Sequence, residues 1–135
     1  MTVIVGFVPT AVGRAALDAA KIEARRRGDR LVIVSSFKGG DTFTREDDRD
    51  AGNEAEAIRR ELTKEGYDFE IVTLVRGQEP TDDLLDIADR HEAPLLVIGL
   101  RRRSAIGKLV LGSNAQRILL EADCPVLSVK APRGS

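Results

Sequence analysis

The chain has 135 residues, of which 42% are hydrophobic and 32% are charged, and its formal net charge is −1 at pH 7. This balance is typical of one globular domain and excludes disordered chains, which carry too few apolar residues to form a core. No apolar run approaches the ~18 residues of a membrane-spanning helix, and no signal-peptide layout is present, so we expect a cytoplasmic protein. A single cysteine, Cys124, suits a reducing compartment, and we expect its side chain to be buried or half-buried.

The first half of the chain alternates apolar runs with helical spacing. Val3–Val8 is an uninterrupted apolar run, which predicts a strand buried on both faces. Apolar residues then recur at helical spacing from Gly13, and three arginines before Gly28 predict the end of that helix. A short second strand is expected at Leu31–Val34. The polar residues 38–50 predict a loop, in which the run REDDRD forms a solvated face.

The same alternation continues to the end of the chain. A second helix is predicted from Ala51 to Gly66, and a third strand over Phe69–Val75. Thr81 is expected to cap the third helix, because a threonine oxygen accepts hydrogen bonds from first-turn N–H groups. The later elements are a fourth strand at Leu95–Ile98 that ends at Gly99, a fourth helix carrying Ala115, Ile118, Leu119 and Ala122, and a fifth strand at Val126–Val129.

This order of elements predicts the fold class. Short apolar strands separated by amphipathic helices require a parallel sheet, because parallel strands are joined by crossover helices. We therefore predict an α/β, Rossmann-like fold: an open five-stranded parallel sheet with helices on both faces. It forms a single domain over residues 1–130, followed by a flexible tail at 131–135. Ligands of such sheets bind beyond the carboxyl ends of the strands, where Thr10, Ser36 and Gly99 are expected.

A basic segment follows the fourth strand. Residues 99–120 contain five basic residues and no acid, so the remainder of the chain is acidic. Gly112, Ser113 and Asn114 open the predicted fourth helix, and free N–H groups at a helix start bind anions. A local basic patch on an acidic chain suits a small anion, such as the phosphates of a nucleotide, better than nucleic acid. The alternative is that Ser113 is only a helix cap behind a glycine turn.

Other phosphate chemistries are excluded by spacing. Gly107 and Lys108 are followed by Leu109, so the Walker pattern fails, and no GxGxxG follows the first strand. No carboxylate stands at the end of that strand for a phospho-acceptor site. The one histidine, His91, has no second ligand or nucleophile in the sequence beside it, so neither a metal site nor catalysis beyond weak ATP hydrolysis is expected.

The element order and the closing sequence VIGLRRRSAIGKLVLGSNAQRILLEADCPVLSVK resemble the universal stress protein family over nearly the whole chain. Nucleotide-binding members carry G-x2-G-x9-G-[ST] before the last helix; Gly99 matches the first glycine, and Gly112 and Ser113 match the closing pair. The resemblance implies a stress-response protein that binds ATP or another adenine nucleotide, with or without Mg2+, as a regulatory ligand. It also implies a homodimer paired through the strand Val126–Val129. The charge distribution and the lack of a long apolar run predict no nucleic-acid and no membrane partner. The implied nucleotide contacts are Thr10 and Ser36 near the ribose or base, and Gly99, Arg102, Gly112, Ser113 and Asn114 around the phosphates.

Two positions depart from the pattern of the nucleotide-binding members. Arg102 replaces the second glycine of the motif, and Val8 stands where those members usually have an acid that helps to hold the adenosine. An arginine at position 102 either donates to the phosphates or fills the pocket, and the sequence does not separate these outcomes. The second outcome favours the alternative function, a nucleotide-independent dimeric interaction module of the same fold.

Overall fold

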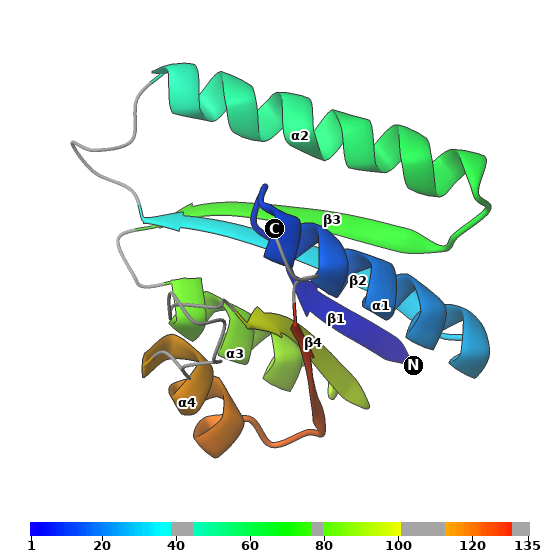
Figure 1. Ribbon diagram of the computed structural model, residues 1–135, viewed down its shortest axis with the longest axis vertical. Coiled ribbons are helices and arrows are strands. Elements are labelled where there is room, and N and C mark those ends of the chain that lie inside the picture. The colour runs from blue at the N-terminus through cyan, green and yellow to red at the C-terminus, as the bar shows by residue number, and fades with distance from the viewer. Residues whose placement is uncertain (39–44, 77–79, 101–112, 131–135) are drawn as a thin grey trace.

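The computed structural model describes residues 1–38, 45–76, 80–100 and 113–130. Within these ranges strands and helices alternate along the chain (Figure 1). The elements are β1 (Thr2–Gly6), α1 (Ala11–Arg27), β2 (Arg30–Lys38), α2 (Arg45–Lys64), β3 (Phe69–Arg76), α3 (Pro80–Arg90), β4 (Leu95–Leu100), α4 (Ser113–Glu121) and β5 (Val126–Lys130). None of the described helices has both the length and the apolar content that crossing a bilayer requires.

The five strands form one parallel sheet in the order β3-β2-β1-β4-β5. The predicted fold class is therefore confirmed. The chain builds outward from the central strand β1 to β2 and β3, then returns to the other side of β1 with β4 and β5. The strand order thus reverses between β1 and β4, which is where ligands of open α/β sheets bind.

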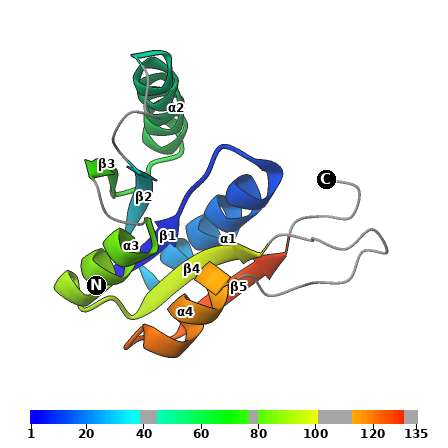
Figure 2. The same cartoon turned by 90° about the vertical axis from the view of Figure 1, so that its left-hand side faces the viewer.

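The sheet separates two apolar layers, because successive side chains of a strand point to opposite faces. Helices α1 and α2 cover one face, with core residues that include Val3, Val5, Leu17 and Leu62. Helices α3 and α4 cover the other, with core residues that include Ile4, Leu84, Leu96 and Ile118. Figure 2 shows β4 and β5 between α1 on one side and α4 on the other.

Helix α1 begins and ends with local signals in the sequence. The Thr10 hydroxyl oxygen accepts a hydrogen bond from the Gly13 N–H at 3.2 Å and so caps the first turn. At the other end Gly28 has the left-handed φ of 67°, and its N–H bonds back to the carbonyls of Ala24 and Arg25. The predicted stop at Gly28 is confirmed.

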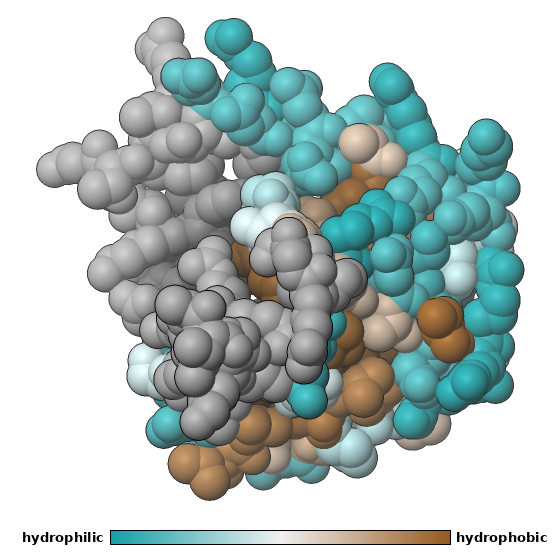
Figure 3. All heavy atoms as spheres, in the orientation of Figure 1, coloured by the Kyte–Doolittle hydropathy of each residue, from teal (hydrophilic) through white to brown (hydrophobic). Residues whose placement is uncertain are grey.

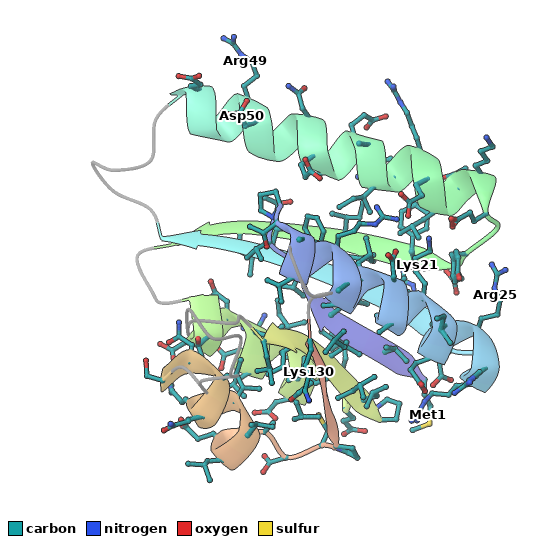
Figure 4. All side chains as sticks on the ribbon, in the orientation of Figure 1. Met1, Lys21, Arg25, Arg49, Asp50 and Lys130 are labelled. Atoms are coloured by element: carbon teal, nitrogen blue, oxygen red, sulfur yellow. The ribbon has the colours of Figure 1, made fainter. Side chains whose placement is uncertain are left out.

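Ion pairs attach the last turns of α2 to α1. Arg14 makes two hydrogen bonds with the Glu61 carboxylate, at 2.8 and 2.7 Å, and Lys21 bonds to both Glu61 and Glu65. The Arg25 guanidinium lies 4.2 Å from the centre of the Tyr67 ring, just after α2. Figure 4 shows Lys21 and Arg25 on α1 near the end of α2.

In the first half of the chain the predicted element boundaries were wrong at three points. Strand β1 ends at Gly6 rather than Val8, because the Val8 carbonyl turns to accept from the Thr10 N–H at 2.8 Å. Strand β2 continues to Lys38 beyond the predicted Val34, paired with β3 alone. The REDDRD run is the start of α2, not a loop. Among the α2 side chains whose burial is described, the buried ones are Ile58 and Leu62, which come late in the helix. The polar run at its start carries no apolar periodicity.

Three expectations in the second half also need correction. Helix α3 begins at Pro80, so Thr81 lies inside its first turn and does not precede it as a cap. Gly99 does not end β4 but lies within it, paired with Val129 of β5. Leu119 is 40% exposed, although helical spacing placed it on the buried stripe. In Figure 3 apolar surface is visible at the bottom of the molecule, where α4 lies, whereas the surface over α2 is hydrophilic.

Candidate functional site

A cavity of about 170 Å³ opens at the carboxyl ends of β1, β2 and β4. Its position is the point where the strand order reverses, as predicted for a ligand site in this fold. Three helices contribute to its wall: α1 through Val12 and Gly13, α3 through Thr81 and Leu84, and α4 through Ile118. The strands and the turn after β1 contribute Gly6, Phe7, Val8, Val34, Ile98 and Gly99.

The wall of this cavity is mostly apolar. Thr81 is the one polar side chain among the residues that line it in the described part of the chain, and no described lining residue carries a carboxylate. Val8 also lines the cavity and is 45% exposed. The described wall therefore suits a flat apolar group and offers nothing that would hold Mg2+ directly.

Two glycines allow the helix and the strands to meet beside the cavity. A Cβ on Gly13 would lie 1.7 Å from the Val8 carbonyl oxygen, and one on Gly99 would lie 2.8 Å from Val12 Cγ2. Real Cβ atoms do not approach other atoms so closely, so both positions require glycine. Gly99 therefore has a packing role that does not depend on any ligand.

The structure brings only some of the predicted contact residues to the cavity. Gly99 lines it, whereas Thr10 is exposed and uses its hydroxyl to cap α1. Ser36 lies in β2, two residues beyond the cavity residue Val34, and pairs with Leu74 of β3. Ser113 and Asn114 are exposed at the start of α4. The predicted contacts Arg102 and Gly112 lie outside the described residues.

The start of α4 is close to the cavity. Ile118 in the wall lies five residues after Ser113, which corresponds to about 8 Å along a helix axis. The first N–H groups of a helix carry no partner within the helix and form its positive end. A ligand whose apolar part fills the cavity can therefore extend an anionic group toward Ser113 and Asn114.

Arg117 is not a free cation of the basic segment. Its guanidinium pairs with the Asp82 carboxylate on α3 and with Glu121 at 2.7 Å on α4 itself. The hydrogen bond with Asp82, followed by that with Glu121, raises the pKa of Arg117. The residues next to this pair, Thr81 and Ile118, both line the cavity. The ion pair thus joins the two helices that form one wall of the site.

Two further residues have no place in this site. His91 is exposed just after α3, and the described ranges contain no group of three or more His, Cys, Asp or Glu side chains able to hold a metal. Cys124 is half-buried, which confirms the prediction made for it. Burial, and then the charges of Asp89 and Asp123, raise the pKa of its thiol.

Sequence reasoning missed most of the cavity wall. The sequence pattern gave no sign that Phe7, Val12 and Ile118 differ from ordinary core residues, and it predicted Thr81 as a helix cap. Their shared position at the site depends on how α1, α3 and α4 cross the strand ends, which periodicity does not report. The signal that could have identified Thr81 is its place after Pro80, since proline favours the first position of a helix and a cap must precede it.

Comparisons with family models, curated proteins and solved structures all find the same protein family. The model of the universal stress protein family matches residues 1–130. A universal stress protein of Mycolicibacterium smegmatis is 41% identical over 133 residues, which are 98% of each chain. The structure of a universal stress protein from Archaeoglobus fulgidus has a TM-score of 0.83 and 37% identity, over 96% of this chain and 98% of that one. A universal stress protein from the same organism, in complex with dAMP, has a TM-score of 0.78 and 34% identity over the same shares.

Proposed function

Because the chain belongs to the universal stress protein family, we propose that it binds an adenine nucleotide as a regulatory ligand in the cytoplasm. The observation that carries this proposal is the apolar cavity at the reversal of strand order, with the start of α4 beside it. The complex of the Archaeoglobus fulgidus relative with dAMP supports the same class of ligand. ATP, ADP and AMP share the base, the ribose and a first phosphate, so all three fit the arrangement.

The assignment of ligand parts follows from polarity. The base fits the apolar cavity, and the phosphates fit the start of α4, where Ser113 and Asn114 are exposed and helix N–H groups are available. Arg102 and Gly112 belong to the segment between β4 and α4 and are proposed to complete the phosphate contacts. Any Mg2+ would come with the phosphates, since no described residue of the wall offers it a carboxylate.

We also propose a homodimer paired through β5. This strand is at the edge of the sheet, beside β4 only, and its residues Val126–Val129 are half-buried in the single chain. An edge strand leaves backbone N–H and C=O groups unpaired, and a two-fold partner strand would satisfy them. Leu96 donates its N–H to the Pro125 carbonyl, so in this parallel register the Leu127 N–H faces β4 and the Ser128 N–H faces the free edge. Sedimentation analysis of Ser128→Pro tests this proposal, because the substitution removes a donor from the free edge and should reduce the dimer.

A specific observation favours a second candidate, a nucleotide-independent interaction module. Val8 lines the cavity where nucleotide-binding members usually have an acid, so adenosine lacks that contact here. An apolar wall binds a base without a carboxylate but with less selectivity. The two candidates differ in whether the protein carries a ligand.

Mass spectrometry separates the two candidates. The purified protein is denatured and the released small molecules are identified and quantified. Adenine nucleotide at near one per chain supports the proposed function. If the sample releases none, and soaking with millimolar AMP before gel filtration still gives none, the interaction module is the better account.

A further inference from the structure

Thr81 is a buried hydroxyl in an otherwise apolar wall. The residue is 5% exposed and lines the cavity with Leu84 and Ile118. No hydrogen bond joins its hydroxyl to another residue in the described part of the chain. Among the described side chains that line the cavity, that of Thr81 is the one able to donate a hydrogen bond.

The Thr81 oxygen keeps some accessible surface. Among the described side chains, no nitrogen or oxygen atom is both enclosed and without a hydrogen-bond partner. Since the Thr81 oxygen has no such partner, it is not enclosed, and the space that Thr81 lines is the cavity. A ligand in the cavity can therefore contact the Thr81 side chain.

The surroundings of Thr81 favour a hydrogen-bond acceptor. The residue lies in the first turn of α3, at the positive end of the helix. The carboxylate of its neighbour Asp82 is compensated by Arg117. The other lining side chains are apolar and suit a flat ring. A purine combines such a ring with ring nitrogens that accept hydrogen bonds.

We propose that Thr81 is a specificity-determining residue of the cavity, whose hydroxyl donates a hydrogen bond to a ring nitrogen of the bound base. The inference rests on the proposed function and deepens it by naming the group that reads the base. It also explains why a threonine, and not a valine of similar shape, stands in this wall.

The proposal predicts opposite effects on binding and on stability. Thr81→Val removes the hydroxyl and keeps the branched shape, so the folded state loses no hydrogen bond and gains an apolar contact. The free energy of unfolding should be unchanged or higher. The affinity for AMP should fall roughly 3- to 10-fold, the size of one hydrogen bond. Thr81→Ser, which keeps the hydroxyl, should retain most of the affinity.

The test is calorimetric titration of AMP into the wild type, Thr81→Val and Thr81→Ser, with urea unfolding of each. Thr63→Val, on the exposed surface of α2, is the matched control and should bind as the wild type does. Equal affinity of the wild type and Thr81→Val would overturn the inference alone. A loss of both stability and affinity in Thr81→Val would show a structural role and overturn it as well. A wild type that binds no AMP would instead refute the proposed function, and the inference with it.

Discussion

Gly99 in β4 faces Val12 in the first turn of α1 so closely that a Cβ on Gly99 would lie 2.8 Å from both the Cγ2 and the carbonyl oxygen of Val12. The first turn of α1 and the end of β4 meet at this point, beside the cavity. A side chain at position 99 would therefore disturb both this contact and the wall of the cavity.

Gly99→Ala should destabilise the protein. The added carbon must displace the Val12 backbone, and this strain should lower the free energy of unfolding by about 1–3 kcal/mol. Gly52→Ala is the matched control: Gly52 is exposed within α2, nothing lies within 4 Å of its Cβ position, and alanine there should stabilise the helix by about 0.5–1 kcal/mol. Urea unfolding measures both. A Gly99→Ala protein as stable as the wild type would show that the contact relaxes without cost.

Asp82→Asn should weaken binding of AMP more than binding of adenosine. The substitution removes the charge that holds Arg117, so the start of α4 is less firmly placed relative to α3. The pair is partly exposed and such pairs are weak, so a loss of only roughly 2- to 5-fold in AMP affinity is expected. Calorimetry with both ligands checks this. Equal losses for AMP and adenosine would mean that the ion pair does not act through the phosphate-binding helix end.

The contact between α1 and α2 should fail in acid. Hydrogen bonds from Arg14, and then from Lys21, lower the pKa of Glu61 from 4.5 to about 2. A carboxyl whose pKa is lower in the folded state contributes its stability in full above about pH 5 and loses it as pH falls toward 2. The Glu61 side chain is 27% exposed, so the contribution is on the order of 1–2 kcal/mol.

Glu61→Gln should therefore be less stable than the wild type at pH 7, and the difference should shrink between pH 5 and pH 2. Thermal unfolding across this range measures the effect. Glu54→Gln, an exposed position on the same helix, is the control and should follow the wild-type curve. A constant difference between Glu61→Gln and the wild type at every pH would exclude the Glu61 carboxylate as its source.

Cys124 should react slowly with thiol reagents. Burial first, and then the charges of Asp89 and Asp123, raise the pKa of its thiol, which lowers the fraction of reactive thiolate near pH 8. Reaction with a disulfide reagent should be several-fold slower than for the urea-unfolded chain. Asp89→Asn should speed it only modestly, since burial is the larger cause. Reaction as fast in the folded as in the unfolded protein would contradict this.

The sheet could be predicted from sequence because its strands are buried on both faces. Val3–Val5 and Leu95–Ile98 are continuous apolar runs. The end of α1 was predictable as well, because Gly28 readily adopts the left-handed conformation that ends a helix. The start of helix α2 was not predicted, because the run REDDRD with which it begins is polar throughout. The α2 side chains that the structure places in the core, Ile58 and Leu62, lie in its later turns.

The candidate site was less predictable, because it depends on distances between elements. Glycine at position 99 fitted a ligand motif, yet the approach of Val12 explains it independently. Arg117 counted as one of five cations in its segment, yet Asp82, 35 positions earlier in the chain, compensates it. Neither relationship appears in local spacing, since both join elements that only the fold brings together.

In the proposed complex a base occupies the cavity while a phosphate lies at the start of α4. Calorimetric titration of AMP and of adenosine into the wild type and Asn114→Asp tests it most directly. The new carboxylate interacts favourably with the positive end of the helix, so Asn114→Asp should be as stable as the wild type. The same carboxylate repels a phosphate. We predict that AMP binds the wild type more tightly than adenosine does, and that Asn114→Asp loses affinity for AMP at least 5-fold while its affinity for adenosine is unchanged. Absence of AMP binding to the wild type, or equal AMP affinities of the two proteins, would contradict the account.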